Sequence, residues 1–106
     1  MNNNSQALGL LGMARRAGKI QQGTERCEAA IKSGKAALAV TCSDISPKTK
    51  KEIDFVCDRY SVCVIHTDIT ATELSNAIGV KAGVAAVCDQ GFAKRLRTLL
   101  TAKRED

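Results

Sequence analysis

Few side chains in this 106-residue chain could do covalent or acid–base chemistry, and they do not cluster along it. The single histidine, His66, ends a predicted strand, where a lone histidine more often has a structural role than a catalytic one. Asp44 and Asp68 each follow a predicted strand, the position where α/β proteins place functional groups. Either aspartate could serve a small enzyme or a phosphoreceiver, but such residues more commonly cap helices.

The cysteines suit neither a zinc site nor a disulfide framework. Their number is odd, no two form a Cys-x-x-Cys pair, and they lie among apolar residues rather than in turns. We therefore expect reduced thiols that fill the core as small hydrophobic side chains, with no metal and no other cofactor. The five are Cys27, Cys42, Cys57, Cys63 and Cys88.

Motifs for binding nucleotides or stacking bases are missing. The segment GMARRAGKI has five residues between its glycines and no Ser or Thr after Lys19, so it is not a P-loop. Aromatic residues make up only 3% of the chain. Tyr60 shares a helical apolar stripe with Ile53, Val56 and Cys57, so we expect it to face the core. The sequence therefore predicts no aromatic platform for bases.

The segment GTER, residues 23–26, could do more than begin a helix. We predict Thr24 as the N-cap of that helix, because threonine oxygens accept hydrogen bonds from first-turn N–H groups. The remaining unpaired N–H groups of a helix N-terminus attract phosphate. Glu25 and Arg26 would stand beside them, one as an acceptor and the other as a donor.

The charge distribution favours an anionic partner. The net charge is +5, with +4 in residues 1–35 and +3 in residues 94–106 against −2 between them. Clustered basic charge is typical of proteins that bind a phosphate backbone. No apolar run is long enough to cross a membrane, and the basic residues near the N-terminus follow the apolar ones, unlike a secretory signal. We expect a cytoplasmic protein without a membrane partner.

Helical and strand patterns alternate along the chain. The strand patterns do not alternate polar with apolar residues, so both faces of the sheet should be covered. This predicts an α/β fold, a three-layer α/β/α sandwich with a central sheet of about four strands, in one domain of residues 1–106 with mobile ends at about 1–4 and 103–106. Strands are expected at 20–22, 37–42, 62–66 and 84–88, and helices after Ser5, Thr24, Ser46, Thr70 or Thr72, and Gly91.

Two long segments, GTERCEAAIKSGKAALAVTCSDISPKTKK and ELSNAIGVKAGVAAV, resemble in order the ribosomal protein L7Ae family. The segments LGLLGMARRAGKI and GFAKRL resemble, more narrowly, its small bacterial YlxQ branch. The resemblance implies an α/β/α sandwich and a non-enzymatic, ribosome-associated protein. Its partner would be a structured RNA, ribosomal RNA included, that contains a kink-turn: a sharply bent duplex with unpaired nucleotides beside sheared G·A pairs. A protein-binding adaptor is the other open alternative.

The family presents a G-T/A-N-E-x-x-K helix to the guanines of the kink. Gly23 and Thr24 match this pattern, whereas Glu25 replaces Asn, Arg26 replaces Glu and Ala29 replaces a frequent Lys. Arginine can donate to guanine O6 and N7, and glutamate can accept from guanine N1 and N2. The resemblance therefore implies that the polar roles are exchanged.

The family also braces an extruded nucleotide with a loop near L-G-x-A-x-G. Leu74, Ala77 and Gly79 match, and Ser75 replaces a glycine. The resemblance, with the nearby cations that could replace the lost lysine, implies an RNA-binding set of Gly23, Thr24, Glu25, Arg26, Lys32, Lys35, Asp44, Ala77, Ile78, Gly79, Val80 and Lys81.

Overall fold

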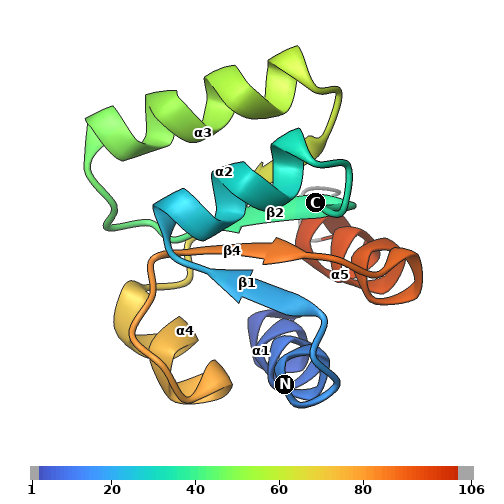
Figure 1. Ribbon diagram of the computed structural model, residues 1–106. Coiled ribbons are helices and arrows are strands. Elements are labelled where there is room, and N and C mark those ends of the chain that lie inside the picture. The colour runs from blue at the N-terminus through green and yellow to red at the C-terminus, as the bar shows by residue number, and fades with distance from the viewer. Residues whose placement is uncertain (1–2, 103–106) are drawn as a thin grey trace.

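The computed structural model describes residues 3–102 and contains a four-stranded sheet between two layers of helices (Figure 1). One face of the sheet is covered by α1 (Asn3–Arg16), α4 (Ala71–Ile78) and α5 (Gln90–Ala102), and the other by α2 (Thr24–Lys32) and α3 (Pro47–Arg59). The predicted three-layer sandwich is confirmed. No helix within residues 3–102 is both long enough and apolar enough to span a membrane.

The sheet is mixed, with the strand order β1-β4-β2-β3. β4 pairs antiparallel with both β1 and β2, and β3 pairs parallel with β2. The strands are β1 (Ile20–Gln22), β2 (Leu38–Thr41), β3 (Cys63–His66) and β4 (Val84–Val87).

The two central strands divide their side chains between two cores. Alternate residues of a strand point to opposite faces. Leu38 and Val87 pack with α1, α4 and α5, whereas Ala39 and Ala86 pack with α2 and α3. Every residue of β2 and β4 is buried, as the unbroken apolar runs predict. The edge strand β3 differs, because Cys63 at its start is exposed.

Helix capping follows the sequence in α3 and α4. The Ser46 hydroxyl accepts from the Thr49 N–H at 3.1 Å, and Pro47 is the first helical residue. Thr70 and Glu73 form a reciprocal capping box at the start of α4. These caps depend only on neighbouring residues, so local patterns are enough to predict them.

Three predicted helix starts are wrong. The N-cap of α2 is Gly23, with φ +91°, and Thr24 is the first helical residue without a capping bond. The φ value there is positive, which glycine adopts readily and threonine does not. Ser5 lies inside α1, which already includes Asn3 and Asn4. Gly91 likewise lies inside α5, which begins at Gln90. Residues 1–2 and 103–106, which belong to the ends predicted to be mobile, lie outside the described part of the chain.

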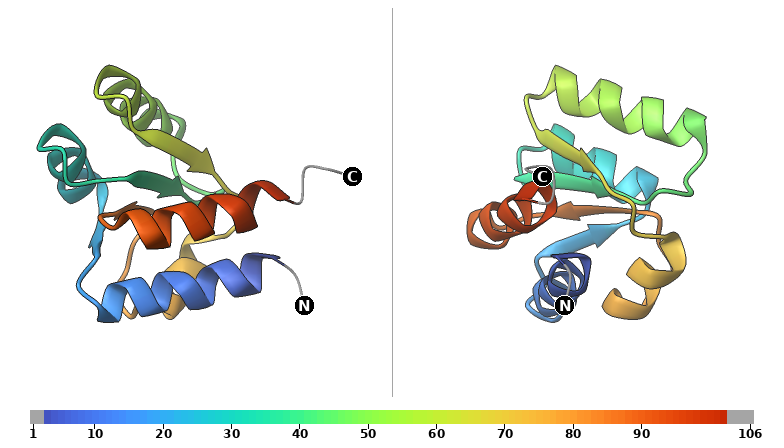
Figure 2. Two further views of the ribbon diagram at one scale, coloured as in Figure 1. Left: turned by 90° about the vertical axis from the view of Figure 1, so that its right-hand side faces the viewer. Right: turned by 180° about the vertical axis from the view of Figure 1, so that it is seen from behind.

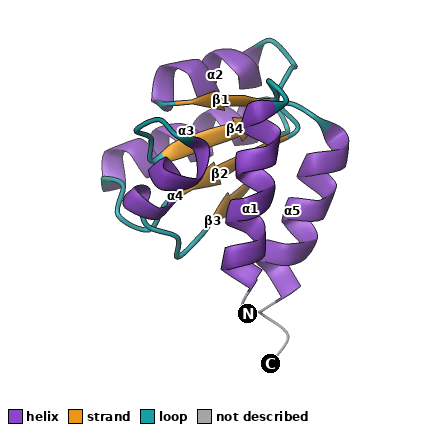
Figure 3. Ribbon diagram, turned by 90° about the horizontal axis from the view of Figure 1, so that it is seen from below, coloured by secondary structure: helices purple, strands orange, loops and turns teal. Residues whose placement is uncertain are grey.

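Helices α1 and α5 lie side by side and run antiparallel (Figure 2). On its other side α1 crosses α4 closely: a Cβ added at Gly12 would lie 2.8 Å from the Ala77 carbonyl oxygen. Helix α1 therefore lies between α4 and α5 (Figure 3).

Candidate nucleic-acid interface

Three loops are joined at one end of the sheet: those that lead from β1 to α2, from β2 to α3 and from α4 to β4. The Gly23 N–H donates to the Val84 carbonyl at 3.1 Å, and the Cys42 N–H donates to the Gly83 carbonyl at 2.9 Å. A Cβ at Gly83 would lie only 2.8 Å from the Ile45 side chain, so the loops approach as closely as glycine allows. The N-terminus of α2 is therefore held beside the loop that follows α4.

Asp44 reinforces this junction as a cap. Its Oδ1 accepts from the Ala71 N–H at 2.9 Å, so it caps α4 from a loop far away in sequence. Asp68 also contacts another segment, because its Oδ1 accepts from the Asn4 amide at 2.7 Å. Of the two uses that the sequence left open for Asp44, the structure shows the cap.

The loop between α4 and β4 is fixed by a serine. Gly79 ends α4 in the left-handed conformation, with φ +82°. The Ser75 hydroxyl accepts from the Ala82 N–H at 3.0 Å and donates to the Ala82 carbonyl at 3.3 Å. A glycine at this position, as in the family pattern, could make neither bond. The loop therefore presents a half-buried Val80 and an exposed Lys81 in a defined conformation.

The predicted apolar contacts of this loop differ in accessibility. Ile78 is only 5% exposed and packs in the core with α1 and α5, so it supports the loop from beneath. It is not available as the surface contact that the sequence predicted. Ala77 is half-buried, so Ala77 and Val80 are the small apolar side chains that a ligand could reach.

Glu25 and Arg26 are both exposed in the first turn of α2. Because Gly23 has no side chain, no side-chain oxygen caps the N–H groups of this turn. Arg26 lines a shallow hollow together with Lys35, on the side of α2 that faces β1. The first turn thus offers a guanidinium on the side that faces β1, a carboxylate that lines the groove between α2 and α3, and backbone N–H donors that no side chain caps.

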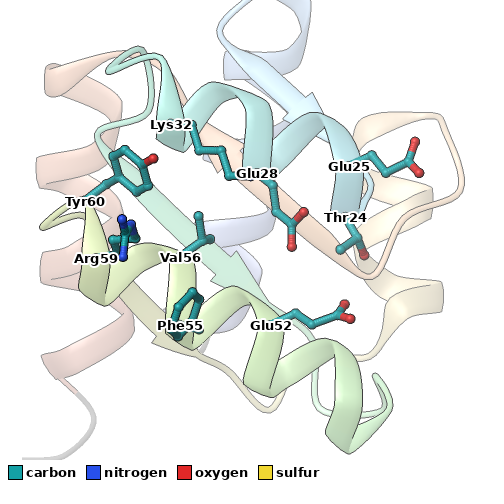
Figure 4. Close-up of a pocket in the computed structure, with 9 residues that line it drawn as sticks. All are labelled: Thr24, Glu25, Glu28, Lys32, Glu52, Phe55, Val56, Arg59 and Tyr60. Carbon is teal, nitrogen blue, oxygen red and sulfur yellow. The ribbon is translucent and has the colours of Figure 1, made fainter.

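Lys32 lies on a different side of α2. It lines the groove between α2 and α3 together with Glu28 and Arg59 (Figure 4). Seven residues separate it from Glu25, which is about 10 Å along a helix axis. The predicted cations therefore form no single face: Arg26 and Lys35 share one side of the helix, and Lys32 occupies the other.

The groove between α2 and α3 exposes two aromatic rings, of which only Tyr60 was predicted to face the core. Phe55 is 69% exposed and Tyr60 is 42% exposed, and both line this hollow of about 600 Å³. The prediction that Tyr60 faces the core is wrong, because Tyr60 is the C-cap of α3 and no longer follows the helical period. Phe55 precedes Val56 and lies outside the apolar stripe, so its place in the helical period already indicated that the ring is exposed.

His66 has a structural position. Its Nδ1 lies 2.6 Å from the Thr41 hydroxyl and its Nε2 lies 2.7 Å from Asp54 Oδ1. An ionised carboxylate only accepts hydrogen bonds, so Nε2 of the ring donates to Asp54. The ring joins β3 to β2 and to α3, as expected for a lone histidine at a strand end.

The prediction that the cysteines fill the core holds fully for three of them, in part for a fourth and not for the fifth. Cys27, Cys42 and Cys57 are buried and Cys88 is half-buried, but Cys63 is exposed. Burial raises the pKa of Cys27 and of Cys42 to about 12, and that of Cys57 to about 11. Within residues 3–102, no group of three histidine, cysteine or acidic side chains is arranged to hold a metal ion.

Comparisons with known proteins agree with this architecture. The model of the ribosomal protein L7Ae/L30e/S12e/Gadd45 family matches residues 5–97. The chain is 33% identical over 98 residues to the RNA-binding protein YlxQ of Enterococcus faecium, covering 92% of this chain and 94% of the relative. It is 37% identical over 92 residues to the RNA-binding protein YlxQ of Bacillus subtilis (strain 168), covering 86% and 91%.

Two solved structures are also similar. A protein of unknown function from Bacillus halodurans C superimposes with a TM-score of 0.84 at 33% identity, covering 89% of this chain and 95% of that chain. The Giardia lamblia 15.5kD RNA binding protein superimposes with a TM-score of 0.76 at 17% identity, covering 94% and 86%. At that identity the second similarity shows a shared fold alone.

Proposed function

We propose that this chain, which belongs to the ribosomal protein L7Ae/L30e/S12e/Gadd45 family and within it to the YlxQ branch, binds structured RNA of the kink-turn type. The observation that carries the proposal is the hydrogen-bonded junction of three loops. It places the first turn of α2 beside the loop after α4, although about fifty residues separate them in sequence. These are the two segments that would contact a kink-turn.

The first turn of α2 would read base edges. Arg26 can donate two hydrogen bonds to O6 and N7 of a guanine, and Glu25 can accept from guanine N1 and N2. Both side chains are exposed and free to reach into a groove. The uncapped N–H groups behind Gly23 would bind an adjacent phosphate.

The loop after α4 would hold the unpaired nucleotide of the bend. Val80 and Ala77 offer small apolar surface, and Lys81 offers a charge for the phosphate backbone. The hydrogen bonds from Ser75 to Ala82 keep this loop in one conformation, so little ordering would be needed on binding. The role assigned here is binding and not catalysis.

The test of this function compares two RNAs and two proteins at one fixed salt concentration. One RNA contains a kink-turn, and the other has its sheared G·A pairs replaced by Watson–Crick pairs. We expect wild type to prefer the kink-turn, and Arg26→Ala to lose ~1–3 kcal/mol of that preference while its affinity for plain duplex changes little.

The matched control is Arg97→Ala, which removes the same charge from an exposed position on α5. It should lower the affinity for both RNAs slightly and to the same extent, because only long-range electrostatics change. Equal binding of the two RNAs by wild type would contradict kink-turn recognition and leave only general RNA binding.

We further propose that the RNA is ribosomal. In a sucrose gradient of bacterial lysate, the wild-type chain should sediment with ribosomal particles at low salt, and Arg26→Ala should shift toward the top fractions. Raising the salt should release both, because phosphate contacts weaken with ionic strength. Sedimentation of the wild-type chain with free protein at low salt would contradict ribosome association.

A further inference from the structure

A groove between α1 and α5 lies outside the surface assigned to RNA. It encloses about 850 Å³, and α1 contributes residues at the spacing i, i+3, i+4 and i+7. Figures 2 and 3 show the two helices side by side, with α4 on the opposite side of α1. The groove is lined by Gln6, Gly9, Leu10, Met13, Arg16, Lys94, Arg95, Thr98 and Leu99.

The groove combines cations with an apolar floor. Arg16, Lys94 and Arg95 are exposed, and no acidic side chain is among the lining residues. Met13 is 49% exposed, one of the few large apolar side chains at the surface of residues 3–102. Methionine adapts its shape to different partners. An occupant would need acidic groups to match the cations and apolar groups to cover the floor.

Gly9 gives a second, independent reason to expect an occupant. It lies inside α1, where glycine lowers helix stability relative to alanine, and its φ is not positive. A Cβ at Gly9 would meet nothing within 4 Å, so packing within the chain does not require glycine there. Gly12 differs, because a Cβ there would clash with the Ala77 carbonyl. Gly9 leaves an open notch in the floor of the groove.

We propose that this groove docks an acidic amphipathic helix of a protein partner. An apolar stripe on that helix would cover the exposed Met13 and the half-buried Leu99, and one bulky side chain would fill the notch at Gly9. Its carboxylates would reach Arg16, Lys94 and Arg95 at the rim. The apolar floor favours a protein helix over duplex RNA, because a duplex keeps its bases stacked inside and presents its phosphates and sugars to the protein.

The probe is a displayed library of random peptides of about 15 residues, roughly four helical turns, selected on the full chain. The selected peptides should be acidic, with apolar residues at i, i+3 or i+4, and i+7. The dissociation constant of the most enriched peptide is then measured by fluorescence anisotropy at one salt concentration. Selected peptides that lack this charge or this spacing would overturn the proposal.

Variants then locate the peptide. Lys94→Glu combined with Arg95→Glu should weaken peptide binding by about tenfold or more. The control pair Lys50→Glu and Lys51→Glu makes the same change in charge on exposed positions of α3 and should leave binding nearly unchanged. Equal loss in both pairs would show attraction by net charge alone and would overturn the assignment to the groove.

Gly9→Leu tests the notch without endangering the fold, because leucine favours helices and the position is open. We expect an equal or higher melting temperature and about tenfold weaker peptide binding. Unchanged peptide affinity would contradict docking at Gly9.

The Lys94→Glu and Arg95→Glu variant also distinguishes a peptide groove from an RNA surface. If it lowers the affinity for plain duplex RNA while peptides bind as before, the groove is an RNA surface and the proposal is wrong. Neither outcome depends on kink-turn recognition.

Discussion

At the scale of single residues, Arg26 is unusual for its position. The positive end of a helix dipole favours Glu25 in the first turn of α2 and disfavours Arg26. Arg26 is exposed and shares its hollow with a second cation, Lys35, so local electrostatics do not stabilise it there. A role in binding an anion or a guanine edge explains the residue better than helix stability does.

Cys27 gives a prediction that depends on pH. Burial, followed by the nearby Cys88, raises the pKa of Cys27 from its ordinary 9.0 to about 12. The folded state therefore holds the proton more tightly than the unfolded state, so this contribution to stability is complete below pH 9 and declines as pH rises toward 12. Cys27→Ala should cost ~1 kcal/mol at neutral pH and should make the fall in melting temperature between about pH 8 and 10 shallower.

Differential scanning calorimetry across that pH range measures both effects. Cys63→Ala is the matched comparison, because it removes a thiol from an exposed position instead of a buried one. Parallel curves for wild type and Cys27→Ala would contradict the prediction.

At the scale of elements, the packing of α1 depends on one glycine and not on the other. Gly12→Ala places a methyl group 2.8 Å from the Ala77 carbonyl oxygen, so α1 and α4 must separate. We expect a loss of ~1–3 kcal/mol in the free energy of unfolding. Gly9→Ala is the matched variant in the same helix and should gain ~0.5–1 kcal/mol, because nothing lies near its new methyl group.

Urea denaturation of the two variants measures these opposite changes. The separation of α1 from α4 should also disturb Ile78 and the loop after it, since Ile78 packs in the same core. Gly12→Ala should therefore lower the affinity for kink-turn RNA more than Gly9→Ala does. Equal stability of the two variants would show that the α1–α4 contact is looser than the structure indicates.

At the scale of the whole molecule, the positive charges divide among separate surfaces. Arg26 and Lys35 lie on the β1 side of α2, whereas Lys32 shares the α2–α3 groove with Glu28 and Glu52. Lys32 and Lys35 are therefore expected to contribute unequally to RNA binding. The acidic side chains of the groove oppose the approach of a phosphate backbone to Lys32.

Salt titrations test this division. Lys35→Ala should reduce the slope of log K against log salt for kink-turn RNA by ~0.7–0.9, the value for one lost phosphate contact. Lys32→Ala should change the slope much less, although it removes the same charge. Equal reductions would show that the RNA crosses both sides of α2.

Features that depend only on neighbouring residues could be predicted from the sequence. The caps at Ser46 and Thr70 follow from short-range hydrogen bonds, and the burial of β2 and β4 follows from their unbroken apolar runs. The three-layer sandwich followed in turn, because strands buried on both faces need helices on both sides. The similarity of whole segments indicated the family.

Features that depend on residues far apart in the chain could not be predicted, because they arise from packing between elements. Gly23, not Thr24, caps α2, in a turn that is also tied to Val84 across the sheet. Strand order and direction, the junction of the three loops and the separation of Lys32 from Lys35 likewise arise from packing between elements. Periodicity assigns a residue to a face of its own helix, but the neighbouring element determines whether that face becomes core, as at Ile78, or groove, as at Met13.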